Sequence, residues 1–491
     1  MEAFQFYSPT QIIFGRGTEE QVGEQIARRG GSRVLVVYGG QSAVKSGLLS
    51  RVLASLEQSG LSCDTLGGVK PNPRLSLVLS GIQRAEAFQA NFLLAIGGGS
   101  VIDTAKAIAD GVANPELDLW DDLWMKKVPL ERSLPVGVVL TIPAAGSESS
   151  DSAVLTKDDT LEKRGLGSDL HRPRFAILNP DLTATLPRYQ VACGVVDIMS
   201  HTMDRYFNPI TTNQLTDELA EGLLRVVISS GRRAMDHPGD YQAMSELMWA
   251  GSLSHNGLTG LGGKKDFAPH QLGHELSARF DSAHGATLSA VWGSWARYCL
   301  DADVSRFARF GVKVWGLDPT GRTERELALS AIDATVDFFH SLDMPTCFSE
   351  LGCGLQSEKE LEELKTGGAV PDAQVPDYNN AKRVMVELNA ILARAREYSL
   401  SFDDVSLDED SGLVRRPVEL TFQTADYAAA REIINDLYHC RYRCSIQDVT
   451  ISADEDGTDI TAAPGAVTQL TAVFLERNDG TVTANQTDGN S

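Results

Sequence analysis

Short apolar runs alternate with amphipathic stretches along residues 1–181. Three runs rich in valine, leucine and isoleucine predict strands, at Arg33–Tyr38, 92–96 and 137–141. Leucines and valines at helical spacing predict helices over 46–58 and 101–109. Strands that alternate with helices in this way predict a mainly parallel α/β sheet with helices packed against it.

The pattern changes after this region. Residues 182–368 contain long stretches with helical periodicity and few strand-like runs, which predicts an all-helical domain. Glycine and proline then interrupt any helix, so we expect a linker over residues 369–377. A small α+β module is predicted over 378–477, with helices at 378–398 and 425–438 and strands at 418–423, 445–452 and 467–475. The polar tail, residues 478–491, is predicted to be disordered.

Composition and charge narrow the function classes. The chain has 491 residues, which favours two or three domains at roughly 100 to 200 residues each. Its net charge of −22 disfavours nucleic acid and anionic membranes as main partners. No apolar run approaches the ~20 residues that cross a bilayer, and the first residues lack a secretory signal, so we expect a cytoplasmic protein without membrane insertion. The seven cysteines lack paired CxxC spacing and are expected to be free thiols.

Two candidate ligand-binding turns follow predicted strands. The turn Gly97-Gly98-Gly99-Ser100 leads into a predicted helix, where backbone N–H groups can bind a diphosphate. The segment Thr141-Ile142-Pro143-Ala144-Ala145-Gly146-Ser147-Glu148 offers hydroxyl and amide groups at another strand end. Each pattern alone is also typical of a tight turn or a helix N-cap. The carboxyl ends of strands are, however, where open α/β sheets bind their ligands.

Acidic and imidazole side chains cluster in the predicted helical domain. Asp197 and His201 are four residues apart, as are His270 and His274, so each pair shares one face of a helix. His284 follows a short distance along the chain. One carboxylate and three neutral imidazoles suit Fe(II), Zn(II) or a neighbouring divalent ion. Spacing alone leaves a metal site and ordinary structural hydrogen bonds about equally open.

In this order, the motifs resemble those of the iron-containing (group III) alcohol dehydrogenase family, most closely its butanol dehydrogenase and NADPH-dependent aldehyde reductase branch. The resemblance covers residues 1 to about 365. It implies a dinucleotide-binding α/β domain and an all-α metal-binding domain, an architecture shared with dehydroquinate synthase. It implies that the metal ligands are Asp197, His201, His270 and His284. His274 matches a family histidine near the nicotinamide, which either relays a proton or only shapes the pocket.

The resemblance also implies a nicotinamide cofactor. The residues expected to contact it are Gly39, Gly40, Ser42, Asn72, Gly97, Gly98, Gly99, Ser100, Asp103, Thr141 and Lys163. No carboxylate follows the first predicted strand in Tyr38-Gly39-Gly40-Gln41-Ser42 to repel a 2′-phosphate, so we expect NADP(H) rather than NAD(H). The alternative for Lys163, which follows Glu162, is an ordinary solvated surface lysine.

The sequence departs from the family pattern in two ways. Ala145 stands where the family usually has threonine, and Ser150 stands where the nearest branch often has asparagine, so we expect weaker or altered cofactor binding. Residues 376–476 instead resemble, in the pattern of elements, the ferredoxin-like domain of PilO-type pilus-assembly proteins. A natural fusion, a gene-model join and an engineered join fit this module equally well, and its partner is not specified.

The resemblance implies a metal-dependent oxidoreductase that interconverts small primary alcohols and aldehydes with NADP(H), and we expect it to be a homodimer. One alternative is a carbon–oxygen lyase of the dehydroquinate synthase type, which shares the architecture and uses nicotinamide transiently. The other is an assembly or binding protein that acts through the C-terminal module. The sequence does not determine the substrate length, the physiological direction, or whether the metal is Fe²⁺ or Zn²⁺.

Overall fold

The computed structural model describes most of the chain: residues 2–208, 213–237, 239–264, 266–352, 375–408, 412–438, 440–442, 444–453, 465–478 and 482. The chain divides into two compact units, residues 1–354 and 355–491. Within the described residues, no helix combines the length and the apolar character needed to cross a membrane.

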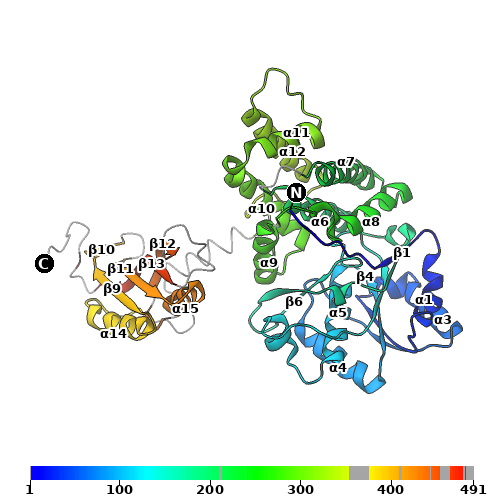
Figure 1. Cartoon of the computed structure of the whole chain (residues 1–491), viewed down its shortest axis with the longest axis horizontal. Helices are drawn as coiled ribbons and strands as arrows, with labels where there is room; N and C mark the ends of the chain where they lie inside the picture. Colours follow the sequence, from blue (N-terminus) through cyan, green and yellow to red (C-terminus); the bar gives the residue numbers. More distant parts are fainter. Residues whose placement is uncertain are drawn as a thin grey trace. The chain divides into compact units, whose positions relative to one another are not determined.

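A six-stranded parallel sheet forms the first part of the unit of residues 1–354, drawn in blue and cyan in Figure 1. Its strands, in spatial order, are β1 (Gln11–Phe14), β8 (Phe175–Leu178), β5 (Val136–Leu140), β4 (Phe92–Gly97), β2 (Arg33–Tyr38) and β3 (Ser62–Leu66). The helices of this part are α1 (Val22–Ala27), α2 (Ser42–Lys45), α3 (Leu48–Gln58), α4 (Leu75–Phe88) and α5 (Gly99–Ala113). This arrangement confirms the predicted α/β sheet.

Alternating side chains of β2 show why helices cover both faces of the sheet. Val34 and Val36 pack in one core with residues of α1 and α3. Leu35 and Val37 point the other way and pack with residues of α4 and α5. Because successive strand side chains point to opposite faces, a strand apolar at every position must be buried on both.

Two local features of this part differ from the prediction. The helix expected over 46–58 begins two residues later, as α3 at Leu48, because Gly47 adopts a left-handed conformation with φ 73° and separates it from the short α2. The hairpin of β6 (Ser152–Thr156) and β7 (Lys163–Gly167) was not predicted. This hairpin follows the turn after β5, and Lys163 is the first residue of its second strand.

The second part of the unit of residues 1–354 is helical, and the described residues between 182 and 352 contain no strand. Its helices are α6 (Arg188–Tyr206), α7 (Gln214–Asp236), α8 (Tyr241–His255), α9 (Ala268–Phe280), α10 (His284–Cys299), α11 (Val304–Trp315) and α12 (Glu324–Ser341). Helix α6 is buried along nearly its whole length from Val191 to Tyr206. The all-helical prediction is confirmed for these residues, and its expected end near 368 lies outside the described ones.

The C-terminal unit contains an antiparallel sheet covered by two helices. Its elements are α14 (Ala381–Leu392), β9 (Glu397–Phe402), β10 (Ser406–Leu407), β11 (Leu413–Thr424), α15 (Tyr427–Tyr438), β12 (Cys444–Ala453) and β13 (Ala466–Arg477). Strand β11 pairs with β13 on one side and with β9 and β10 on the other, while β12 pairs with β13. Apart from the two-residue β10, the order α–β–β–α–β–β is a permutation of the ferredoxin-like β–α–β–β–α–β order.

Two boundaries in this module differ from the prediction. The helix expected over 378–398 ends at Leu392, and Tyr398 already belongs to β9. Strand β11 begins at Leu413 rather than 418 and runs through Pro417. The carbonyl of Pro417 accepts a hydrogen bond from the Asp403 N–H, on the side where β9 has ended and β10 has not yet paired, so the missing proline N–H breaks no bond to β13. Most of the predicted tail lies outside the described residues, and its disorder stays a prediction.

Candidate metal and cofactor site

Three helices bring the predicted metal ligands together. Helix α6 carries Asp197 and His201 one turn apart, α9 carries His270, and α10 begins at His284. Gly285 allows α10 to lie against α6, since a Cβ atom there would lie 2.3 Å from the Cys193 carbonyl oxygen. The four residues predicted from the sequence as metal ligands therefore lie in one cluster.

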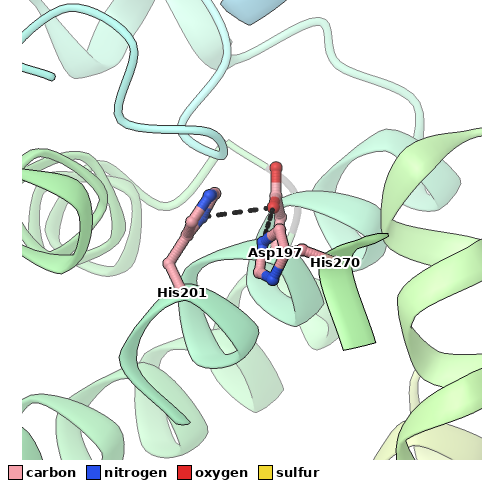
Figure 2. A group of neighbouring side chains, drawn as sticks. All are labelled: Asp197, His201 and His270. Atoms are coloured by element: carbon pink, nitrogen blue, oxygen red, sulfur yellow. Dashed lines mark ion pairs between the residues drawn. The ribbon is translucent and has the colours of Figure 1, made fainter. Parts of the chain in front are cut away.

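Asp197 lies at the centre of this cluster. Its Oδ1 atom is 3.3 Å from His201 Nδ1, 3.8 Å from His270 Nε2 and 3.9 Å from His284 Nε2. Figure 2 shows the imidazoles of His201 and His270 directed at this one carboxylate oxygen. Asp197, His201 and His270 each offer a ligand atom within 4.8 Å of the others, and all three residues are buried.

The unpaired atoms of these side chains fit a divalent cation. Asp197 Oδ1, His201 Nδ1 and His270 Nε2 are buried and have no hydrogen-bond partner. Buried polar atoms are almost always paired, so three unpaired atoms facing one another require an explanation. A divalent ion would pair these atoms: nitrogen and oxygen ligands about 2.0–2.1 Å from one ion lie roughly 3 to 3.5 Å apart, and the separations here, 3.3 to 3.9 Å, are close to that.

A second carboxylate, which the sequence analysis did not identify, orients His270. Asp204 Oδ2 lies 2.6 Å from His270 Nδ1, and the Asp204 side chain is fully buried. Burial alone would lower the pKa of His270, but the carboxylates of Asp204 and Asp197 raise it to about 9. Nε2 can bind a cation only after it gives up its proton, and the hydrogen bond from Nδ1–H to Asp204 then keeps the remaining proton on Nδ1 and Nε2 directed at the cluster. Asp204 follows Asp197 by seven residues, two turns along the same face of α6, and this spacing was the available signal.

His255 packs against the imidazole of His201, and no role was assigned to it from the sequence. Its ring lies 4.0 Å from the His201 ring, centroid to centroid. Its Nε2 atom is 2.9 Å from Ser152 Oγ, and its Nδ1 atom is 3.1 Å from the Arg205 guanidinium. Arg205 also donates to the His201 carbonyl oxygen at 2.7 Å. Strand β6 and helix α8 therefore help to fix His201.

The structure places His274 beside the cluster rather than inside it. Its ring centroid is 5.0 Å from that of His284 and 6.5 Å from that of His270. Burial, with the nearby Lys163 charge, lowers the pKa of His274 well below its usual value. The neutral imidazole has one nitrogen that donates and one that accepts a hydrogen bond.

The predicted cofactor residues gather along one edge of the parallel sheet. Gly39, Gly40 and Ser42 follow β2, Gly97 ends β4, Gly98 is the N-cap of α5, Gly99 and Ser100 begin that helix, and Thr141 follows β5. These three strands are neighbours in the sheet and run in the same direction. Their carboxyl ends therefore meet, as the fold class predicts for a nucleotide site.

Close packing explains the glycines between β4 and α5. A Cβ atom on Gly99 would lie 2.9 Å from Ala145 Cβ, and one on Gly98 would lie 3.1 Å from Ile142 Cβ. Gly146, in the same neighbouring turn, has φ 65° and lies against helix α8, where a Cβ atom would be 2.5 Å from the Gly251 carbonyl oxygen. Glycine at these positions lets the two turns and α8 approach one another.

A buried lysine organises the turn after β5. Lys106 Nζ donates to the carbonyl oxygens of Ser147 at 2.7 Å and Ser152 at 2.8 Å. Burial lowers the pKa of Lys106 to about 8. Asp103 accepts hydrogen bonds from Ser147 Oγ at 2.6 Å and from the Val154 N–H at 3.1 Å. Both Asp103 oxygens thus bind the chain itself, and the cofactor contact predicted for Asp103 stays a prediction.

Lys163 is not a solvated surface lysine. It is 8% exposed, and its Nζ donates to Asn72 Oδ1 at 3.0 Å. Burial lowers its pKa to about 8. The Asn72 amide donates in turn to Asp281, which ends α9 in the helical part. Asn72 and Lys163 therefore connect the α/β part to the helix that carries His270 and His274.

Comparison with known families agrees with this geometry. Residues 9–180 match the family model "Iron-containing alcohol dehydrogenase". Residues 191–394 match the model "Fe-containing alcohol dehydrogenase family, C-terminal". The second match extends past residue 365, where the sequence resemblance was expected to end, and includes α14.

Similar proteins extend this result. NADH-dependent butanol dehydrogenase A of Clostridium acetobutylicum is 40% identical over 373 residues, which cover 75% of this chain and 93% of that protein. NADPH-dependent aldehyde reductase YqhD of Escherichia coli is 37% identical over 368 residues, or 74% and 94% of the two chains. A crystal structure of NADH-dependent butanol dehydrogenase A from Thermotoga maritima matches with a TM-score of 0.69 and 37% identity, covering 72% of this chain and 87% of that one. Since the family models span most of the chain and these relatives align over nearly their whole length, the chain belongs to the iron-containing alcohol dehydrogenase family and is an alcohol dehydrogenase.

Proposed function

We propose that this enzyme interconverts small primary alcohols and aldehydes with NADP(H), using one divalent ion held by Asp197, His201, His270 and His284. The observation that carries the proposal is the set of buried, unpaired ligand atoms around Asp197 Oδ1. The relatives support the reaction class, since their names describe butanol dehydrogenases and an aldehyde reductase.

The donor set suits this chemistry. When bound, the divalent ion supplies a positive charge that polarises the substrate oxygen, and the nicotinamide supplies or accepts the hydride. The protein positions both: Asp204 and His255 fix the imidazoles of His270 and His201. Lys163 and Asn72 connect the nucleotide edge to α9.

His274 is the proposed catalytic histidine, as a relay between substrate oxygen and solvent. Its position beside His284, outside the unpaired cluster, supports a role toward substrate rather than as a ligand. In His274→Phe, we expect lower turnover and an altered pH profile with unchanged metal content. Unchanged turnover and pH profile would leave His274 only the role of shaping the pocket.

The preference for NADP(H) rests on the end of β2. No carboxylate lies in Gly39-Gly40-Gln41-Ser42, and a Cβ atom on Gly40 would meet no atom within 4 Å, which leaves space for a 2′-phosphate. The names of the similar proteins include both NADH and NADPH. The values of kcat/KM for the two cofactors with butanal test this preference, and a strong preference for NADH would contradict it.

Metal removal combined with an aldehyde panel tests the proposal as a whole. Dialysis against a chelator should abolish NADPH oxidation with short aldehydes, and Fe²⁺ or Zn²⁺ should restore it. Metal analysis of the purified protein identifies the ion. Full activity in the metal-free protein would refute the proposed centre, and the absence of any net NADPH oxidation would revive the carbon–oxygen lyase alternative.

We also propose a cytoplasmic homodimer, as expected from the sequence. Light scattering of the purified full chain measures its mass in solution. A mass equal to that of a single 53.1 kDa chain would contradict the homodimer.

A further inference from the structure

Two cysteines of the C-terminal unit lie close together at the turn between α15 and β12. Cys440 follows α15, and Cys444 is the first residue of β12. Their Sγ atoms are 3.9 Å apart. Helix α15 and strand β12, which flank this turn, are drawn in orange and red in Figure 1. Three residues separate the two cysteines, so the pair lacks CxxC spacing, and ordinary free thiols were expected here.

Local contacts hold both sulfur atoms at this turn. Cys440 Sγ donates to the Tyr442 carbonyl oxygen at 2.9 Å, and Cys444 Sγ donates to the Leu437 carbonyl oxygen at 3.4 Å. Cys440 belongs to the core of the module and is 7% exposed, whereas Cys444 is partly exposed. A disulfide bond is about 2.05 Å long, so the two sulfur atoms need to approach each other by roughly 2 Å for the bond to form.

We propose that Cys440 and Cys444 form a reversible disulfide when the protein meets a peroxide, which makes this turn an oxidation-sensitive site. In the first step, the Cys440 thiolate attacks a peroxide oxygen, the O–O bond breaks, and sulfenic acid forms with release of hydroxide or alkoxide. In the second step, the Cys444 sulfur attacks the Cys440 sulfur. The S–S bond forms, the S–O bond breaks, and water leaves with the thiol proton.

The order of these steps follows from the two thiols. When Cys440 ionises, the Cys444 S–H can turn from the Leu437 carbonyl oxygen to the Cys440 sulfur; this contact lowers the pKa of Cys440 and, with burial, raises the pKa of Cys444. The thiolate is the reactive form, so Cys440 is the attacking residue and Cys444 resolves the sulfenic acid.

The crosslink would join two elements that already pack together. Helix α15 packs against β12, and β12 lies at the edge of the sheet, beside β13 alone. A disulfide between 440 and 444 therefore fixes the start of this edge strand to the end of the helix. Both cysteines lie within the C-terminal unit, so the proposal is independent of the metal centre.

The sequence between the cysteines offers a direct test. Arg441 and Arg443 separate them, so trypsin cuts between them and places Cys440 and Cys444 in peptides 432–441 and 444–477. The reduced full-length protein is treated with hydrogen peroxide, alkylated, digested and examined by mass spectrometry. We expect the two peptides to be joined, with the loss of two hydrogens relative to the thiols, and to separate after reduction with dithiothreitol.

Matched variants make the result specific. Cys440→Ser and Cys444→Ser should each abolish the joined peptide, whereas Cys347→Ser, at a cysteine of the enzyme unit (residues 1–354), should leave it unchanged. Circular dichroism of each variant checks that the fold persists. Separate alkylation of both cysteines, at peroxide levels that oxidise other thiols of the chain, would overturn the proposal. Crosslinks chiefly to other cysteines would overturn it as well.

Discussion

Asp204 shows how one buried carboxylate can control a proposed metal ligand. In Asp204→Asn, the amide holds the Nδ1–H of His270 less strongly and can also donate to Nδ1, which would place the proton on Nε2. We expect metal affinity to fall about 10- to 100-fold, the usual cost of losing such a partner. Competition with a chromophoric chelator measures this affinity without relying on activity.

Asp217→Asn is the matched control for this change. Asp217 is as deeply buried as Asp204, but it pairs with Arg306 at 2.6 Å, apart from the cluster. Its substitution should lower thermal stability and leave metal affinity unchanged. Equal losses of affinity in both variants would mean that Asp204 acts only through general stability.

Lys163 gives the cofactor site a predicted pH dependence. Its pKa is lowered to about 8, so the side chain is charged below that pH and neutral above it. If the ammonium contacts the bound cofactor, the KM for NADPH is constant below pH 8 and rises above it. Loss of one charge-assisted hydrogen bond should raise this KM about tenfold or more.

Steady-state kinetics on both sides of pH 8 test this expectation. Lys163→Met should have a raised KM for NADPH that no longer changes across this range. Lys157→Met, at a lysine directly after β6, should retain the wild-type profile. A wild-type profile in Lys163→Met would remove Lys163 from the cofactor site.

Of the site residues, the sequence identifies those whose proximity follows from helical spacing. Asp197 and His201 share a helix face, and the structure places both in one cluster with His270. The roles of His255 and Lys106 depend on elements distant in sequence, namely their contacts with Ser152 and Ser147. No local pattern reports such contacts, so a single sequence could not reveal them.

Among the elements, the turn after β5 depends most on a single glycine. Gly146→Ala combines a positive φ with a close approach to the backbone of α8. We expect a loss of roughly 2–5 kcal/mol of stability from strain and overpacking together. Thermal or urea unfolding of the metal-free protein measures it.

Gly257→Ala distinguishes backbone strain from overpacking against α8. Gly257 also has a positive φ, 100°, but an added Cβ atom would meet nothing within 4 Å. This variant should lose only about 1–3 kcal/mol, the cost of backbone strain. If both variants lose the same amount, the contact with α8 contributes nothing.

Element types were predicted best where burial and periodicity agree. Strands β2 and β4 are continuous apolar runs, and both were identified within one residue of their observed ends. The hairpin of β6 and β7 was missed because its exposed and buried positions do not form one long apolar run. In the module, the strand predicted over 418–423 is part of the longer β11, which includes Pro417 because β9 has ended and β10 has not yet begun to pair at that residue.

At the scale of the molecule, each unit has cores of its own. The three large cores of the enzyme unit draw only on residues before 352, and those of the module only on residues after 375. We therefore expect a chain that ends at residue 370 to retain the metal affinity and turnover of the full chain. Chelator competition and kcat/KM with butanal measure both quantities.

A chain that ends at residue 394 is the informative comparison, because the C-terminal family model reaches that position. If only the longer chain is soluble and active, the segment containing α14 completes the catalytic fold. Equal activity of both chains would make the whole module dispensable for catalysis.

The pairing of β11 with β13 sets the order in which the protein can be completed during synthesis. Strand β13 lies between β11 and β12, and the Tyr378 N–H donates to the Arg477 carbonyl oxygen, which ties the first described segment of the module to its last strand. The ribosome must therefore translate past residue 477 before the module can close. The strands and helices around the metal cluster all lie before residue 342, so they leave the ribosome earlier and this part of the nascent chain can fold first.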